Sequence, residues 1–137
     1  MDVSGRRLWV RALLLAGVAY AAIGIVFAAL AGDAHHVRAW RLAAWVVSAV
    51  VAAAHMWYEH YRLGSSPRPT ALHAAGAVAL GAFGLALAAN VHWLVAGTHG
   101  QRPPLLALPV WPVVTALPAF LAALAIAAVL ARFGRVR

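Results

Sequence analysis

Ionisable residues gather in the stretch AAAHMWYEHYRLGSSPRP, at positions 52–69, where a long apolar run ends. The stretch holds His55, Glu59, His60 and Arg62. Ionisable side chains are costly in hydrocarbon, and those found there commonly serve a function. On an ideal helix His55 and Glu59 lie about one turn apart on one face, whereas His60 points about 140° away from His55. We therefore take His55 and Glu59 as candidate site residues and expect His60 at the membrane interface.

These two residues belong to a longer stripe with helical spacing. Its positions recur every three or four residues: Arg41, Trp45, Ser48, Ala52, His55, Glu59 and Arg62. At about 100° per residue they fall within a sector of roughly 100° on a helix. Valine and aromatic residues occupy the opposite face. Because lipid cannot satisfy polar groups, the pattern predicts that the stripe faces other helices and the valine-rich face meets lipid.

A third candidate residue, His73, lies in the next apolar run. We count outward along both helices from the LGSSPRP turn, near residues 65 and 66. The count places His73 within about one helical turn of both Glu59 and His55. We therefore expect His55, Glu59 and His73 to converge, with Arg62 just beyond them.

Three chemical uses fit two imidazoles and one carboxylate. The group is a ligand set suited to a divalent transition metal, Zn²⁺ or non-haem Fe²⁺. It can also relay protons, because imidazole titrates near neutral pH. In a third use, His55 and His73 are the axial ligands of a b-type haem. A structural role remains as the alternative, in which Glu59 forms an ion pair with Arg62 and His55 fastens two helices through a hydrogen bond.

A second polar group is expected at the opposite end of the molecule. It consists of Asp33, His35 and His36 between the first two apolar runs, and His92 late in the third run. Histidines beside an aspartate can bind a divalent metal, and solvated loop residues are the alternative interpretation.

The composition indicates which elements position these residues. Of the 137 residues, 65% are apolar and 10% charged, whereas about half and about a quarter are usual in soluble domains. A helix needs roughly 20 apolar residues to cross a bilayer. Four runs satisfy this length, at about 8–31, 39–63, 71–97 and 105–131. We predict an all-α integral membrane protein, with residues 1–137 forming one membrane domain, a compact four-transmembrane-helix bundle of up-down topology.

Small residues recur at helical spacing in the first run and in the third run. The first run carries Gly17, Ala21, Gly24, Ala28 and Ala31, and the third carries Ala77, Gly81, Gly84 and Ala88. Such stripes let helix backbones approach closely, which is how helices associate in a membrane.

The arginines predict the orientation of the helices. All eleven basic residues are arginine, and eight of them fall at one end of the predicted helices: Arg6, Arg7, Arg11, Arg62, Arg68, Arg132, Arg135 and Arg137. The opposite end has three: Arg38, Arg41 and Arg102. The positive-inside rule then places the N- and C-termini in the cytoplasm of a bacterial cell, with the chain crossing the inner (plasma) membrane. The net charge of +8 is spread over helix ends, which favours contact with the lipid bilayer and no nucleic acid.

Several classes of chemistry lack their sequence motifs. The chain has no cysteine, which excludes disulfides and thiolate chemistry. It has no nucleophile elbow, His-Glu-x-x-His pair, phosphate-binding loop or dinucleotide fingerprint, so an enzymatic role is left open without support. We expect a homo-oligomer or a component of a larger membrane complex that binds or transports a transition metal, or relays protons. The alternatives are a non-catalytic accessory subunit of a larger membrane complex and a haem b protein.

Overall fold

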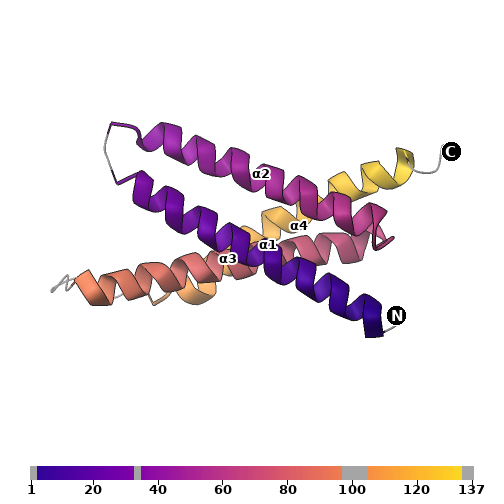
Figure 1. Cartoon of the computed structure of the whole chain (residues 1–137), viewed down its shortest axis with the longest axis horizontal. Coiled ribbons are helices and arrows are strands. Elements are labelled where there is room, and N and C mark those ends of the chain that lie inside the picture. Colours follow the sequence, from indigo (N-terminus) through magenta and orange to yellow (C-terminus); the bar gives the residue numbers. More distant parts are fainter. Residues whose placement is uncertain (1–2, 33–34, 97–104, 134–137) are drawn as a thin grey trace.

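Four long helices make up the molecule. The computed structural model of the chain describes residues 3–32, 35–96 and 105–133. The helices are α1 (Val3–Leu30), α2 (Val37–Tyr61), α3 (Pro67–Ala96) and α4 (Ala107–Phe133) (Figure 1). Each is long and apolar enough to cross a membrane. The all-α class and the four apolar helices predicted from the sequence are therefore confirmed.

The start of α3 differs from the prediction. Pro67 and Pro69, expected in the preceding loop, form the first turn of this helix. The first N–H groups of a helix have no intrahelical acceptor, so proline is tolerated there. The Ser66 carbonyl accepts hydrogen bonds from both the N–H and the hydroxyl of Thr70, each at 3.2 Å. Gly64, with a φ of 61°, adopts the left-handed conformation that reverses the chain between α2 and α3.

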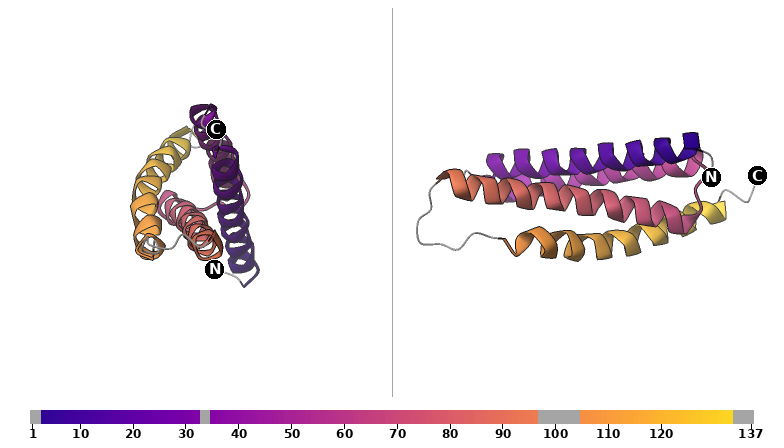
Figure 2. Two further views of the ribbon diagram at one scale, coloured as in Figure 1. Left: turned by 90° about the vertical axis from the view of Figure 1, so that its left-hand side faces the viewer. Right: turned by 90° about the horizontal axis from the view of Figure 1, so that it is seen from below.

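The helices form two antiparallel pairs that cross each other. In Figure 1, α1 lies beside α2 and α3 lies beside α4, and the contacts between α1 and α3 join the two pairs. Contacts of α2 with α3 and α4 are sparse. The start of α1, the α2–α3 turn and the end of α4 lie at one end of the molecule (Figure 2).

Glycine and alanine bring the backbones of α1 and α3 into contact. A β-carbon added at Gly81 would overlap Tyr20 and would lie 3.2 Å from the Gly17 carbonyl oxygen and 3.3 Å from the Ala21 amide nitrogen. One added at Gly84 would lie 2.9 Å from the β-carbon of Ala21. The two stripes of small residues therefore face each other and allow the close packing on which membrane helices depend.

The interior is small and the outer surface is strongly apolar. Its buried cluster consists of Met56 from α2, Ala71 from α3, and Ala123 and Ala127 from α4. Large apolar side chains are exposed on all four helices. An apolar exterior of this extent is suited to lipid and would be unfavourable in water.

Candidate functional site

Glu59 and His73 form a hydrogen-bonded pair between α2 and α3. The His73 Nδ1 atom lies 3.0 Å from Oε1 and 3.1 Å from Oε2 of Glu59. The Glu59 side chain is fully buried, and that of His73 is 17% exposed. An ionised carboxylate accepts a hydrogen bond from Nδ1–H, whereas a protonated carboxyl donates one to Nδ1. The pair can therefore hold a proton on either partner without losing the hydrogen bond.

The tight turn between α2 and α3 brings Glu59 and His73 opposite each other along the two helices. The Tyr58 carbonyl accepts the N–H of Arg62 at 2.9 Å, and the Glu59 carbonyl accepts the N–H of Ser65 at 3.2 Å. These bonds end α2 and direct the chain into α3. His73 in the second turn of α3 then meets Glu59 in the last turn of α2, which confirms the convergence of these two residues predicted by counting from the turn.

Trp9 on α1 fixes the ring of His73. The two ring centroids are 4.4 Å apart and the ring planes differ by 2°, a parallel stack. An indole face also stabilises an imidazolium that lies over it. This contact was missed from the sequence. The available signal was that Trp9 lies at the same end of the molecule as the His73 pair.

His55 lies one turn before Glu59 on α2 and is 7% exposed. Its Nε2 atom is buried and has no hydrogen-bond partner within the described part of the chain. His55 therefore lies near the Glu59–His73 pair, one helical turn from Glu59 along α2. Within the described ranges, no group of three His, Asp or Glu side chains is arranged to hold one metal ion, and metal binding by these residues stays a prediction.

A hollow of about 540 Å³ lies between α1 and α2 and reaches His55. Its polar lining residues are Arg11, His55 and Tyr58, and Leu15, Ala19 and Val51 are among its apolar ones. His55 is thus the lining residue that lies one helical turn from Glu59 along α2.

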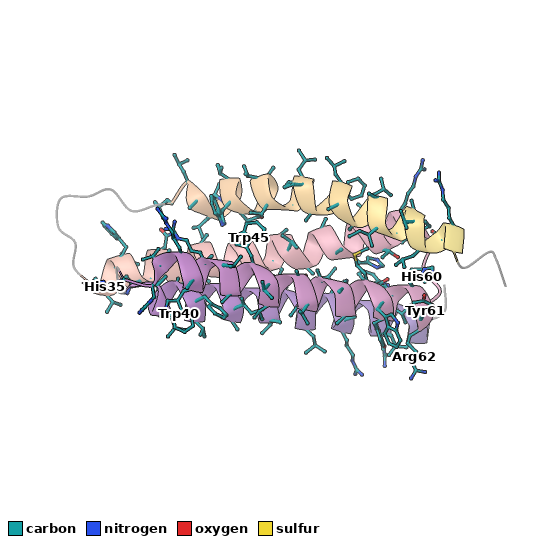
Figure 3. All side chains as sticks on the ribbon, turned by 90° about the horizontal axis from the view of Figure 1, so that it is seen from above. His35, Trp40, Trp45, His60, Tyr61 and Arg62 are labelled. Carbon is teal, nitrogen blue, oxygen red and sulfur yellow. The ribbon has the colours of Figure 1, made fainter. Side chains whose placement is uncertain are left out.

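The polar stripe of α2 is buried only toward the end of the helix. Trp45 is 77% exposed, Arg41 and Arg62 are also exposed, and Ser48 is half-buried. Trp45 on α2 and Arg62 directly after α2 are labelled in Figure 3. The prediction that the whole stripe faces other helices is therefore wrong for these three exposed residues. The physical reason is that α2 packs along α1 but contacts α3 and α4 at few places. Most of the length of α2 therefore has no helix beside it other than α1.

The ion pair between Glu59 and Arg62, which belongs to the alternative of a purely structural role, does not form between these two described residues. The carboxylate contacts His73 instead, and the Arg62 side chain is exposed. His60 is half-buried and its ring meets the edge of Tyr61, with centroids 4.8 Å apart. His60 therefore takes no part in the site, in agreement with its predicted direction.

The candidates at the opposite end are exposed where the structure describes them. His35 and His36 precede α2 and His92 lies late on α3, and all three are exposed. His35 is labelled in Figure 3. Asp33 lies outside the described residues. Exposure favours the alternative of solvated polar side chains at this end.

Comparison with known proteins assigns no family to the chain. No family model matches it, and no curated protein or solved structure shows significant similarity to it. The function must therefore be argued from the chemistry of the site.

Proposed function

We propose that this chain is a multi-pass membrane protein that binds and releases a proton at an intramembrane site formed by Glu59, His73 and His55. The carrying observation is a fully buried carboxylate with both oxygens within 3.1 Å of one imidazole nitrogen. The membrane location is supported by four helices of sufficient length and apolarity.

The charge balance of the pair supports a proton as its ligand. Glu59 is the single glutamate in the chain, and the two aspartates, Asp2 and Asp33, lie outside the four helices. With a neutral imidazole, an ionised Glu59 leaves one negative charge buried in the site. Burial disfavours an uncompensated charge. One added proton removes that charge, whether it resides on the carboxyl group or on the imidazole.

His55 supplies a route for that proton. It lines the hollow between α1 and α2 and lies one helical turn before Glu59 on α2. An imidazole can accept a proton at one nitrogen and release one from the other. In this proposal His55 passes the proton between the hollow and Glu59, and the Trp9 stack keeps His73 aligned with the carboxylate.

A zinc or ferrous ion is a second candidate ligand, favoured by one observation. A carboxylate hydrogen-bonded to one imidazole nitrogen commonly orients a histidine that binds metal through the other nitrogen. In that case the Nε2 atoms of His73 and His55 are ligands and Glu59 is a positioning residue. Elemental analysis of the purified protein distinguishes the two candidates, and an absorption spectrum of the same sample tests for haem.

Infrared difference spectroscopy tests the proton site, because the chain has so few carboxyl groups. Since the pair shares a proton, we expect carboxyl bands of Glu59 and bands of an imidazole to change with one common pH midpoint. Glu59→Gln should remove the carboxyl component, and the matched control Asp33→Asn should leave it in place. Carboxyl and imidazole bands that titrate independently, or a coupled carboxyl band that survives in Glu59→Gln, would contradict the proposal.

A further inference from the structure

The hollow between α1 and α2 has a polar end and an apolar end. Because the two helices are antiparallel, Arg11 near the start of α1 lies level with Tyr58 near the end of α2. Farther from this end the lining is apolar and includes Leu15, Ala19 and Val51. Arg11 and Ala19 are eight residues apart, about 12 Å along a helix. Polarity therefore falls along the hollow over a distance comparable with a lipid head group and the first part of its acyl chain.

The charge of the polar end favours an anionic ligand. Arg11 is the one permanently charged side chain among the described residues that line the hollow. Tyr58 adds a hydrogen-bonding hydroxyl group beside Arg11, and His55 adds an imidazole about one helical turn deeper in the hollow. The volume of about 540 Å³ lies within the range of about 300–1,000 Å³ typical of small-molecule sites.

We propose that this hollow binds one acidic diacyl phospholipid. The phosphate lies against Arg11, Tyr58 bonds the head group, and an acyl chain follows the apolar wall from Leu15 to Ala19. The lipid comes from the anionic leaflet of the membrane, because a negatively charged leaflet attracts the arginine-rich end of the molecule, where Arg11 lies. The proposal goes beyond the proton site, with which it shares the membrane location, the hollow and its lining residue His55.

The test compares lipids on the purified full chain in detergent. Phosphatidylglycerol, phosphatidylcholine with the same acyl chains, and oleate are titrated separately while the midpoint of thermal unfolding is recorded. We expect phosphatidylglycerol to raise the midpoint of thermal unfolding more than the other two lipids, because it alone combines a net negative charge with two acyl chains. Arg11→Gln should weaken the apparent affinity for phosphatidylglycerol about fivefold, the usual size of one arginine contact at an anionic surface. The matched control is Arg132→Gln, an exposed arginine at the same end on α4, which should keep the wild-type affinity.

A second variant blocks the hollow without changing its charge. Ala54 is exposed on α2 and lines the hollow, so Ala54→Phe should fold and abolish the shift caused by phosphatidylglycerol. An equal shift with phosphatidylcholine or oleate would overturn the assignment of the ligand. An equal loss of affinity in Arg11→Gln and Arg132→Gln, or a full shift in Ala54→Phe, would overturn the site. The infrared experiment on the proton site uses a separate readout, so the failure of one proposal does not imply the failure of the other.

Discussion

Burial of Glu59 becomes tolerable because His73 supplies a hydrogen-bond partner from the neighbouring helix. An ionised carboxylate without a partner is costly in a low-dielectric interior, and pairing lowers that cost. His73 is itself held against Trp9 by the parallel stack. One side chain from each of α1, α2 and α3 therefore contributes to this arrangement. The Glu59–His73 pair links α2 to α3, a helix with which α2 has few further contacts.

Replacement of Trp9 tests that linkage at the level of one residue. Trp9→Leu removes the stack on His73 and should lower the free energy of unfolding by about 1–2 kcal/mol, since aromatic pairs contribute about 0.5–1.5 kcal/mol beyond burial. The measurement is thermal or chemical unfolding in detergent, followed by circular dichroism.

The matched control for that experiment is Trp45→Leu. Trp45 is 77% exposed on α2, so its replacement should change the stability by no more than about 0.5 kcal/mol. Equal effects of the two substitutions would show that the stack on His73 contributes nothing specific. Loss of the coupled infrared signal in Trp9→Leu, with the fold retained, would further support its positioning role.

The contact between α1 and α3 is the element that joins the two helix pairs. Its closeness depends on positions where any side chain would collide with backbone atoms. At Gly81 an added β-carbon meets backbone atoms of Gly17 and Ala21. Backbone atoms cannot rotate away as a side chain can, so the helices themselves would have to separate. The crossing angle and separation of the pairs therefore depend on a few glycines.

The substitution Gly81→Ala tests this dependence. It should destabilise the protein by about 1–3 kcal/mol, the usual cost of overpacking, although alanine favours a helix. Gly76→Ala on the same helix is the control, because its β-carbon would meet only the end of the flexible Leu13 side chain, at 3.1 Å. This control should be neutral or stabilising by up to about 1 kcal/mol. Unfolding in detergent gives both values, and equal destabilisation by both changes would contradict the packing argument.

Features governed by local periodicity could be predicted from the sequence. The lengths of apolar runs identified four helices. The spacing of small residues identified faces of α1 and α3 that allow close packing, although not that these two faces meet. The short turn before Pro67 fixed the relative level of Glu59 and His73, so counting residues was enough to place them together. In each case the answer depends on helix geometry and on short connections.

The crossing of the helix pairs could not be predicted in this way. Periodicity tells which residues share a face of α2, and it does not tell where a second helix covers that face. Trp45 was therefore placed toward other helices, whereas it is exposed. The Trp9–His73 stack was missed for the same reason, because it depends on how α1 lies across α3.

On the scale of the whole molecule, the features to which we propose a function share one end. The end of the molecule formed by the start of α1 and the α2–α3 turn holds the Glu59–His73 pair and the polar end of the hollow. It also holds most of the arginines of the described helices. Most of the titratable groups at the other end are exposed histidines and arginines. A proton or an acidic lipid would thus reach the protein from the basic side, which the positive-inside rule assigns to the cytoplasm.

That assignment can be tested with single cysteines, because the natural chain has none. Ser66 is exposed in the α2–α3 turn and His36 is exposed before α2, at the opposite end of that helix. A membrane-impermeant maleimide added to intact bacterial cells should label His36→Cys at once and Ser66→Cys only after the membrane is permeabilised. The cysteine-free wild type controls for background labelling. The reverse pattern would place the basic end outside the cell, and labelling of both sites in intact cells would indicate two orientations. Either result would remove the anionic cytoplasmic leaflet as the source of the lipid and the cytoplasm as the source of the proton.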